Sequence, residues 1–203
     1  RYQALNDLGY HTSLKDIKEH YHLGTGSMGL LKELGIKLTP KQQKDYIQAS
    51  FNHFADRDNA LKYTKIHPDA HNTLATLSKK YILVLVTSRN SLSTTKEELE
   101  RFKIKQFFTL IVTREIAAEY YGAEQMPLLP FREQRTKLYK TAIALTGIKP
   151  QEMLCVGDSI DEIEPAKKLG MKTIGVLTGF SSKQDMQNAK IPAVKNLTEL
   201  TRT

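Results

Sequence analysis

The chain has 203 residues, 40% of them hydrophobic and 26% charged, which suits a water-soluble fold with one sizeable core and room for a small extra domain. No apolar run approaches the roughly 18 residues of a membrane span, and Cys155, the only cysteine, excludes an intrachain disulfide and favours a reducing, cytoplasmic setting. The net charge of +8 favours anionic partners, but zinc-finger spacing, an RNA-binding signature and a recognition helix are absent, so neither nucleic acid nor a membrane is expected.

The first 66 residues contain helical patterns and no good strand. The helical stretches are Tyr2–Leu8, Leu14–His20, Met28–Leu34 and Lys41–Phe54. We therefore expect residues 1–66 to form a helical cap domain. His67-Pro68-Asp69 then marks the start of a new helix, because proline suits the first turn and Asp69 complements the positive end of the helix dipole.

Strands and helices alternate through residues 67–203. The predicted strands are Tyr81–Val86, Leu110–Val112, Met153–Val156 and Thr173–Val176, and the predicted helices are Lys96–Phe102, Thr136–Leu145 and Glu162–Leu169. This alternation is typical of βαβ units, so residues 67–203 are expected to form an α/β, Rossmann-like core with a parallel sheet. Tyr81–Val86 is continuously apolar, as in a central strand covered on both faces. The connection Thr113–Phe131 is long for such a fold, which is typical of functional or mobile loops.

Two strand ends carry polar groups where ligands collect in open α/β sheets. Thr87-Ser88-Arg89-Asn90 follows the first predicted strand and could hold phosphoryl oxygens through hydroxyl and backbone N–H groups. A plain polar turn is the alternative.

The second strand end is acidic. Gly157-Asp158-Ser159-Ile160-Asp161-Glu162 places carboxylates near the start of a helix, and Mg²⁺ prefers such hard oxygen ligands and needs only one or two from the protein. Helix capping is the alternative, with Asp158 or Ser159 as the N-cap and the other acids complementing the helix dipole.

These residues carry a resemblance to a known family. Val86-Thr87-Ser88, the Gly157–Glu162 segment and Gly170-Met171-Lys172-Thr173-Ile174-Gly175-Val176 together resemble the haloacid dehalogenase (HAD)-like hydrolase superfamily, particularly its phosphoglycolate-phosphatase-like branch. The likeness extends over nearly the whole chain, including the helical residues 1–66, which are similar to that branch's cap. It implies Mg²⁺-dependent hydrolysis of a small phosphorylated metabolite through an aspartyl-phosphate intermediate.

The resemblance also implies residue roles. Thr87 would donate a hydrogen bond to the phosphoryl group, and Ser88 and Arg89 would lie near the substrate, although Arg89 is alternatively a solvated or salt-bridged arginine. Asp158 would hold Mg²⁺ directly or through water. Glu162 falls where the family's second acid sits, and Asp161 is a close substitute for it.

The chain departs from the family pattern at its third motif, which supplies a cation. The usual lysine position falls on Glu133, but Lys137 and Arg135 lie nearby and either could stabilise phosphoryl charge. A set of solvated first-turn cations beside an altered site is the alternative.

The family's nucleophile strand, which ends in Asp-x-Asp, has no counterpart in the sequence. Neither the nucleophile nor the general acid/base can therefore be named. In the implied fold that strand lies between the strands ending at Val86 and Val156, and leaving it out exposes unpaired backbone groups. We expect the 203 residues to belong to a longer protein that supplies it. The alternatives to a phosphatase are a dehalogenase, which the acidic cluster disfavours, and a catalytically impaired phosphate-binding or interaction protein of the same fold. The oligomeric state is not readable from the sequence.

Overall fold

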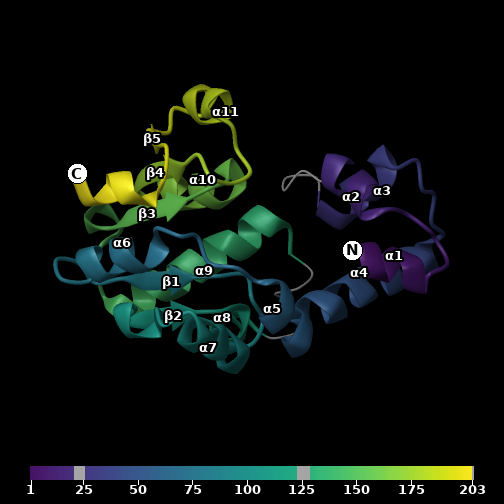
Figure 1. Cartoon of the computed structure of the whole chain (residues 1–203), viewed down its shortest axis with the longest axis horizontal. Coiled ribbons are helices and arrows are strands. Elements are labelled where there is room, and N and C mark those ends of the chain that lie inside the picture. Colours follow the sequence, from purple (N-terminus) through teal and green to yellow (C-terminus); the bar gives the residue numbers. More distant parts are fainter. Residues whose placement is uncertain (21–25, 123–128, 203) are drawn as a thin grey trace. The chain divides into compact units, whose positions relative to one another are not determined.

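The computed structural model describes residues 1–20, 26–122 and 129–202, and the chain divides into two compact units, Arg1–Thr64 and Lys65–Thr203 (Figure 1). The predicted boundary was between residues 66 and 67, and the role of the first unit as a cap stays a prediction. None of the helices in the described ranges combines the length and the apolarity needed to cross a bilayer.

In its described part, the first unit has only helices as regular structure. They are α1 (Tyr2–Asp7), α2 (Leu14–His20), α3 (Gly26–Glu33), α4 (Pro40–Ala55) and α5 (Arg57–Tyr63). The longest helix, α4, begins with a capping box in which Thr39 and Gln42 satisfy each other's backbone N–H groups, followed by Pro40 in the first turn. The helix α5 was not predicted; its start is marked by Asp56, whose carboxylate accepts from the Asn59 N–H at 2.7 Å.

Apolar residues from the helices of the first unit form a core of their own. The buried members are Ala4, Leu5, Ile17, Leu30, Leu31 and Tyr46. Because this cluster is independent of the strands, the first unit is a separate hydrophobic core rather than an extension of the second.

The second unit contains parallel strands. They are β1 (Val84–Val86), β2 (Leu110–Val112), β3 (Leu154–Gly157), β4 (Lys172–Val176) and β5 (Ala193–Val194). β1 pairs with β2, and β3, β4 and β5 pair in that order, so the described residues form two sheets with every pair parallel. The predicted α/β class with parallel strands is confirmed. The expectation of a further strand between β1 and β3 stays a prediction.

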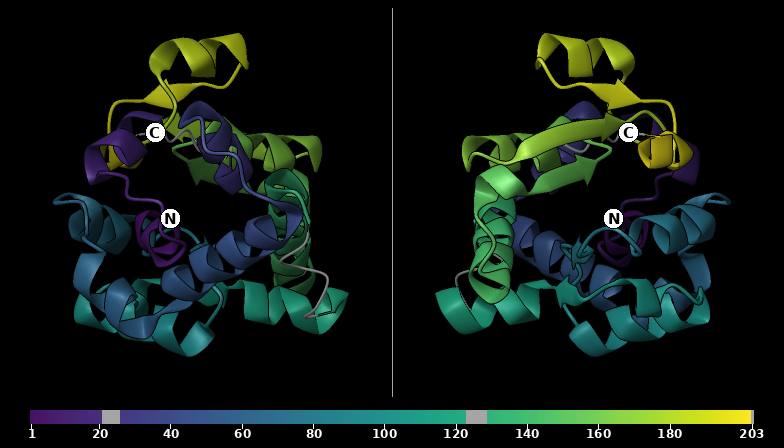
Figure 2. Two further views of the ribbon diagram at one scale, coloured as in Figure 1. Left: turned by 90° about the vertical axis from the view of Figure 1, so that its right-hand side faces the viewer. Right: turned by 90° about the vertical axis from the view of Figure 1, so that its left-hand side faces the viewer.

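Helices and short 3₁₀ turns connect these strands. They are α6 (Ala70–Leu77), α7 (Leu92–Arg101), η2 (Lys105–Phe107), α8 (Arg114–Tyr121), α9 (Phe131–Thr146), η4 (Pro150–Glu152), α10 (Ile160–Lys168), α11 (Lys183–Asn188) and η5 (Leu197–Arg202). Figure 2 shows α11 and β5 at one end of this unit and α7 and α8 at the other.

Three local expectations differ from the structure. β1 begins at Val84 rather than at residue 81, because a turn in which the Tyr81 N–H bonds to the Leu77 carbonyl follows α6, and the three β1 residues are half-buried rather than covered on both faces. α6 begins at Ala70, so Pro68 lies before its first turn; Asp69 is the N-cap residue, but its carboxylate accepts from the backbone N–H and hydroxyl of Thr198, both at 3.2 Å, rather than from the helix. The connection predicted over 113–131 contains the helix α8, and its residues 123–128 lie outside the described residues.

Helix α9 packs against both sheets. Leu138 and Ala142 join a cluster with Val112 of β2, whereas Tyr139 joins a cluster with Cys155 of β3. Because these residues of one helix join different clusters, α9 packs against the strands of both sheets.

Candidate active site

The turn after β1 is held by its own backbone and hydroxyl groups. The Thr87 N–H donates to the Val112 carbonyl at 2.9 Å, and the Thr87 Oγ1 accepts from the Arg89 N–H at 3.2 Å. Accepting this bond uses a lone pair, so the hydroxyl keeps a proton that can be donated to a phosphoryl oxygen. The same bond is expected of a plain polar turn, so it is compatible with both interpretations.

Arg89 is tied to the neighbouring helix. Its Nη2 lies 3.0 Å from Oε1 of Glu98 on α7, and Glu98 is only 5% exposed. The geometry therefore agrees with the salt-bridged alternative for Arg89, and a contact with substrate stays a prediction.

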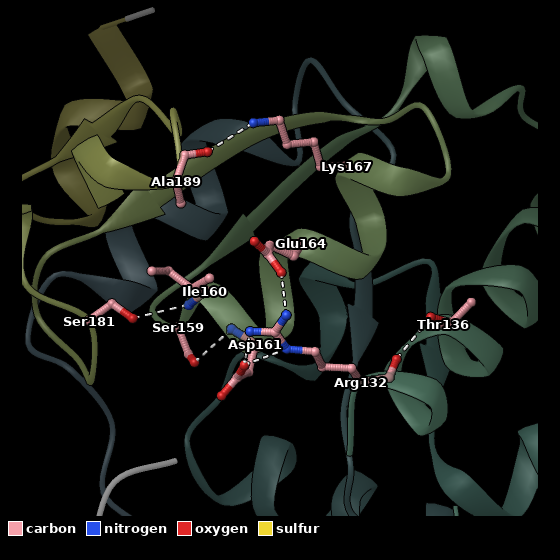
Figure 3. Close-up of polar contacts among 9 residues, drawn as sticks. All are labelled: Arg132, Thr136, Ser159, Ile160, Asp161, Glu164, Lys167, Ser181 and Ala189. Atoms are coloured by element: carbon pink, nitrogen blue, oxygen red, sulfur yellow. Dashed lines mark hydrogen bonds and ion pairs between the residues drawn. The ribbon is translucent and has the colours of Figure 1, made fainter. Parts of the chain in front are cut away.

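Ser159 caps the helix that follows β3. Its Oγ accepts from the Asp161 N–H at 3.3 Å, and the preceding N–H, of Ile160, donates to Oγ of Ser181 at 3.0 Å (Figure 3). Because Ser159 takes the capping role, the carboxylate of Asp158 is available for another one.

The carboxylate of Asp158 lies against the loop after β4. The Ser181 N–H donates to the Asp158 carbonyl at 3.0 Å, and a Cβ placed on Gly179 would lie 1.8 Å from Oδ2 of Asp158. Only glycine at position 179 permits this approach. Gly157 has a related role, since a Cβ there would lie 3.0 Å from Cγ1 of Ile163, so it allows close packing of α10.

Asp158 and Glu162 converge. The pKa of Glu162 is raised, first by burial and further by the nearby carboxylate of Asp158 and the charge of Asp161. The positive charge of Arg135 opposes this rise. A carboxyl group whose pKa is raised beside other carboxylates favours a proton or a cation.

Arg135 connects the two strand ends. It is 5% exposed, and its Nη2 lies 3.3 Å from Oε1 of Glu162. Its Nη1 donates to the Val86 carbonyl and to Oγ of Ser88, each at 3.4 Å. Of the two predicted cations, Arg135 is therefore the one that lies between the turn after β1 and the acidic pair Asp158 and Glu162.

Tyr139, one helical turn beyond Arg135, completes the buried network. Its hydroxyl accepts from Nη2 of Arg135 at 3.2 Å and donates to the Glu162 carbonyl at 3.0 Å. Burial raises the pKa of Tyr139, so the hydroxyl keeps its proton. Cys155 donates to the same oxygen at 3.5 Å, in agreement with its expected place inside a strand.

The remaining candidates are engaged elsewhere. The ammonium of Lys137 lies 4.3 Å from the centre of the Tyr121 ring on α8. Asp161 accepts from Nε of Arg132 at 2.6 Å, and Arg132 also pairs with Glu164 (Figure 3). Their roles as catalytic cation and metal ligand stay predictions, to which these contacts lend no support.

The acidic pair fits a hard divalent cation. Asp158 and Glu162 are close enough for the charge of Asp158 to raise the pKa of Glu162, although burial is the larger cause of that rise. Within the described ranges no group of three or more His, Cys, Asp or Glu side chains could hold a metal. Mg²⁺ needs only one or two carboxylates and takes water or substrate oxygens for the rest, so the pair is sufficient in chemistry.

Sequence reasoning missed Tyr139, Gly179 and Ser181. Gly179 and Ser181 follow β4, so applying the strand-end rule to that strand would have found them. Tyr139 lies four residues after Arg135 on a helix, a spacing that puts two side chains on the same face, and this was the available signal.

A cavity of about 770 Å³ lies elsewhere, on the outer side of β2 between α7 and α8. None of the candidate site residues lines it. The candidate active site at the ends of the strands is therefore separate from this cavity.

Two family models match the chain. The family described as haloacid dehalogenase-like hydrolase matches residues 2–124, and the family described as HAD-hydrolase-like matches residues 132–201. The first match covers more than half of the chain, so the chain belongs to the haloacid dehalogenase-like hydrolase family. The predicted resemblance and the prediction of an enzyme of this hydrolase class are confirmed.

Individual relatives are more distant. The chain is 28% identical over 178 residues to the phosphoglycolate phosphatase of Aquifex aeolicus, covering 88% of this chain and 75% of that protein. It is 26% identical over 188 residues to the glyceraldehyde 3-phosphate phosphatase of Pyrococcus furiosus, covering 89% of this chain and 69% of that one. Among solved structures, a putative phosphatase from Clostridium difficile has a TM-score of 0.75 at 22% identity, covering 98% of this chain and 86% of that chain. This last likeness shows the fold alone, and it confirms the predicted Rossmann-like core.

Proposed function

We propose that the protein is a Mg²⁺-dependent phosphatase that hydrolyses a small phosphorylated metabolite through an aspartyl-phosphate intermediate. The observation that carries this proposal is Arg135, a buried cation in contact with Ser88 beside Thr87 on one side and with Glu162 beside Asp158 on the other. Transfer of a phosphoryl group requires hydrogen-bond donors, a cation and a metal site close together. The contacts of Arg135 bring this cation to the candidate donors on one side and to the candidate metal ligands on the other.

Each residue has a definite task in this proposal. Thr87 and Ser88 donate hydrogen bonds to phosphoryl oxygens, and Arg135 supplies a charge that is never lost to deprotonation. Asp158 and Glu162 would hold Mg²⁺, which when bound offsets charge on the phosphoryl oxygens. The nucleophilic aspartate that the pathway requires is not assigned to any residue of this sequence.

Two relatives support the substrate class. They are named phosphoglycolate phosphatase and glyceraldehyde 3-phosphate phosphatase, so we extend to this chain only the hydrolysis of a small phosphate ester. The first unit would choose among such esters as a cap, and its closure would exclude water from the reaction.

A catalytically impaired phosphate-binding or interaction protein is the second candidate. Glu133, which occupies the family's usual lysine position, is exposed in the first turn of α9 and favours this alternative. Arg135 argues against it, because it brings a cation to the acidic pair from two residues further along the same helix.

Hydrolysis of p-nitrophenyl phosphate by the full-length protein separates the two candidates. We expect turnover that requires Mg²⁺, stops with a chelator and is lost in Asp158→Asn. The matched control is Thr178→Ala, which changes an exposed residue in the loop after β4 and should keep wild-type turnover. Turnover that does not depend on added metal, or an Asp158→Asn variant as active as wild type, contradicts the metal assignment. Phosphate binding without turnover supports the second candidate.

A further inference from the structure

The acidic residues of α10 are shared between two arginines of α9. Arg135 pairs with Glu162. Arg132, one helical turn earlier on α9, holds Asp161 and Glu164 (Figure 3). Its Nε and Nη2 both lie 2.6 Å from Oδ1 of Asp161, and its Nη1 donates to Oε2 of Glu164. These two acids are three residues apart and therefore lie on one face of α10, so a single guanidinium engages both.

The burial of these acids indicates that Arg132 does more than form a surface ion pair. The side chain of Arg132 is 51% exposed, but those of Asp161 and Glu164 are only 15% and 29% exposed. An exposed ion pair contributes little to stability, whereas partly buried carboxylates left without a partner would attract another cation. Arg132 therefore occupies two carboxylates that would otherwise be free to bind a metal ion.

Asp161 lies close to the proposed metal ligands. It is the neighbour of Glu162 in the chain, and its charge contributes to the raised pKa of Glu162. In the described part of the chain, however, no three His, Cys, Asp or Glu side chains are placed to hold a metal together. The contact with Arg132 accounts for this, because it turns the Asp161 carboxylate toward α9.

The number of available carboxylates decides which cation such a site prefers. Mg²⁺ keeps several waters and takes only about one or two carboxylates, whereas Ca²⁺ takes roughly six to eight oxygen ligands in a flexible arrangement. Freeing Asp161 would add an oxygen ligand and a negative charge beside Asp158 and Glu162. Both changes favour Ca²⁺ more than Mg²⁺.

We propose that Arg132 sets the metal preference of the site, because it withholds Asp161 and Glu164 from the cation and so favours Mg²⁺ over Ca²⁺. Arg132 is a positioning residue in this role, since it acts through the carboxylates and contacts neither the metal nor the substrate. The inference rests on the proposed function in one respect, namely that Asp158 and Glu162 hold the metal.

Calorimetric titration of the full-length protein with Mg²⁺ and, separately, with Ca²⁺ measures this preference as the ratio of the two dissociation constants. We expect Arg132→Gln to shift the ratio toward Ca²⁺ by at least about tenfold, as residues that support metal ligands do. Adding Asp161→Asn to that variant should return the ratio toward wild type, because the freed carboxylate is then missing. The matched control is Lys140→Gln, which removes the same charge from an exposed position on α9 and should leave the ratio unchanged. Since Arg132 is half-exposed, its replacement should cost little stability, and the variant should fold.

The results distinguish this inference from the proposed function. An unchanged ratio in Arg132→Gln, or an equal shift in Lys140→Gln, overturns the role of Arg132 and leaves the metal site in place. A shift that persists in full after Asp161→Asn also overturns it, because Asp161 would not be the withheld ligand. A wild-type protein that binds neither ion overturns both this role and the metal assignment. Metal binding with the expected shift but without turnover supports the inference and contradicts the phosphatase.

Discussion

Nη2 of Arg135 on α9 lies 3.3 Å from Oε1 of Glu162 on α10, and this ion pair joins two helices that pack side by side. Nη1 of the same guanidinium donates to the Val86 carbonyl at 3.4 Å, so Arg135 contacts both the end of β1 and an acidic residue of α10.

Replacing Arg135 by methionine should reduce phosphate-ester hydrolysis by about 10²–10³-fold, the usual effect of losing one preorganised donor to developing charge. Lys137→Met, two residues along the same helix, is the matched control and should retain most activity, because its ammonium lies over Tyr121. Initial rates at saturating Mg²⁺ measure both. If Lys137→Met reduced activity more than Arg135→Met, Lys137 rather than Arg135 would be the cation that stabilises phosphoryl charge.

Alanine at position 179 should impair the candidate metal site without replacing a charged residue. Its Cβ would lie 1.8 Å from Oδ2 of Asp158, so the carboxylate must move away. We expect Gly179→Ala to weaken Mg²⁺ about 10–100-fold, the range found when support of a metal ligand is lost. Calorimetric titration with Mg²⁺ measures the change, with Thr178→Ala as the control. Unaltered Mg²⁺ affinity would show that Asp158 does not hold the metal.

Mg²⁺ should stabilise the protein more at high pH than at low pH. The pKa of Glu162 is raised above its usual 4.5, mainly by burial, so the carboxyl still holds a proton at a pH where an ordinary glutamate has lost it. Metal must displace that proton, and its binding therefore weakens as pH falls through the raised pKa. The Mg²⁺-induced increase in melting temperature should be larger at about pH 8 than at about pH 5.

Glu162→Gln is the control for this pH dependence. An amide has no such proton, so the remaining Mg²⁺ effect in that variant should vary less with pH. An equal pH dependence in wild type and Glu162→Gln would assign the titrating group elsewhere.

Removing the hydroxyl of Tyr139 should destabilise the fold. Tyr139→Phe keeps the ring but takes an acceptor from Arg135 and a donor from the Glu162 carbonyl in a buried place. The expected loss is about 1–3 kcal/mol of unfolding free energy, the range for leaving buried partners unsatisfied. Denaturant unfolding measures it, and Tyr120→Phe, whose side chain is 51% exposed, should change little. A Tyr139→Phe variant as stable as wild type would mean that water replaces the hydroxyl.

Much of the fold could be predicted because hydrophobic periodicity marks elements locally. Leu14–His20 and Leu110–Val112 have the predicted bounds, and α9 and α10 contain nearly all of the helices predicted there. Tyr81 and Ile82 were predicted within a strand but are 58% and 60% exposed. Their apolar character agrees with a strand, but the turn after α6 prevents them from reaching one, and such competition between neighbours is not visible in a window of residues.

The sequence predicted which residues belong to the candidate site better than it predicted the contacts between them. The strand-end rule found Thr87 and Asp158, since position after a strand is a property of the sequence. It could not choose between Arg135 and Lys137, because the choice depends on which face of α9 turns toward β3. Nor could it foresee that Arg132 pairs with Asp161, a contact between residues 29 positions apart.

The position of α9 affects how the second unit unfolds locally. Leu138 and Tyr139 are adjacent in sequence, yet one anchors the β1–β2 sheet and the other the β3–β4–β5 sheet. Neither sheet can lose its packing without loosening the same helix, so amide protons in the middle of α9 should exchange with solvent only in openings that involve both sheets. Hydrogen exchange should therefore find a single cooperative unit where the strand pairing alone suggests two.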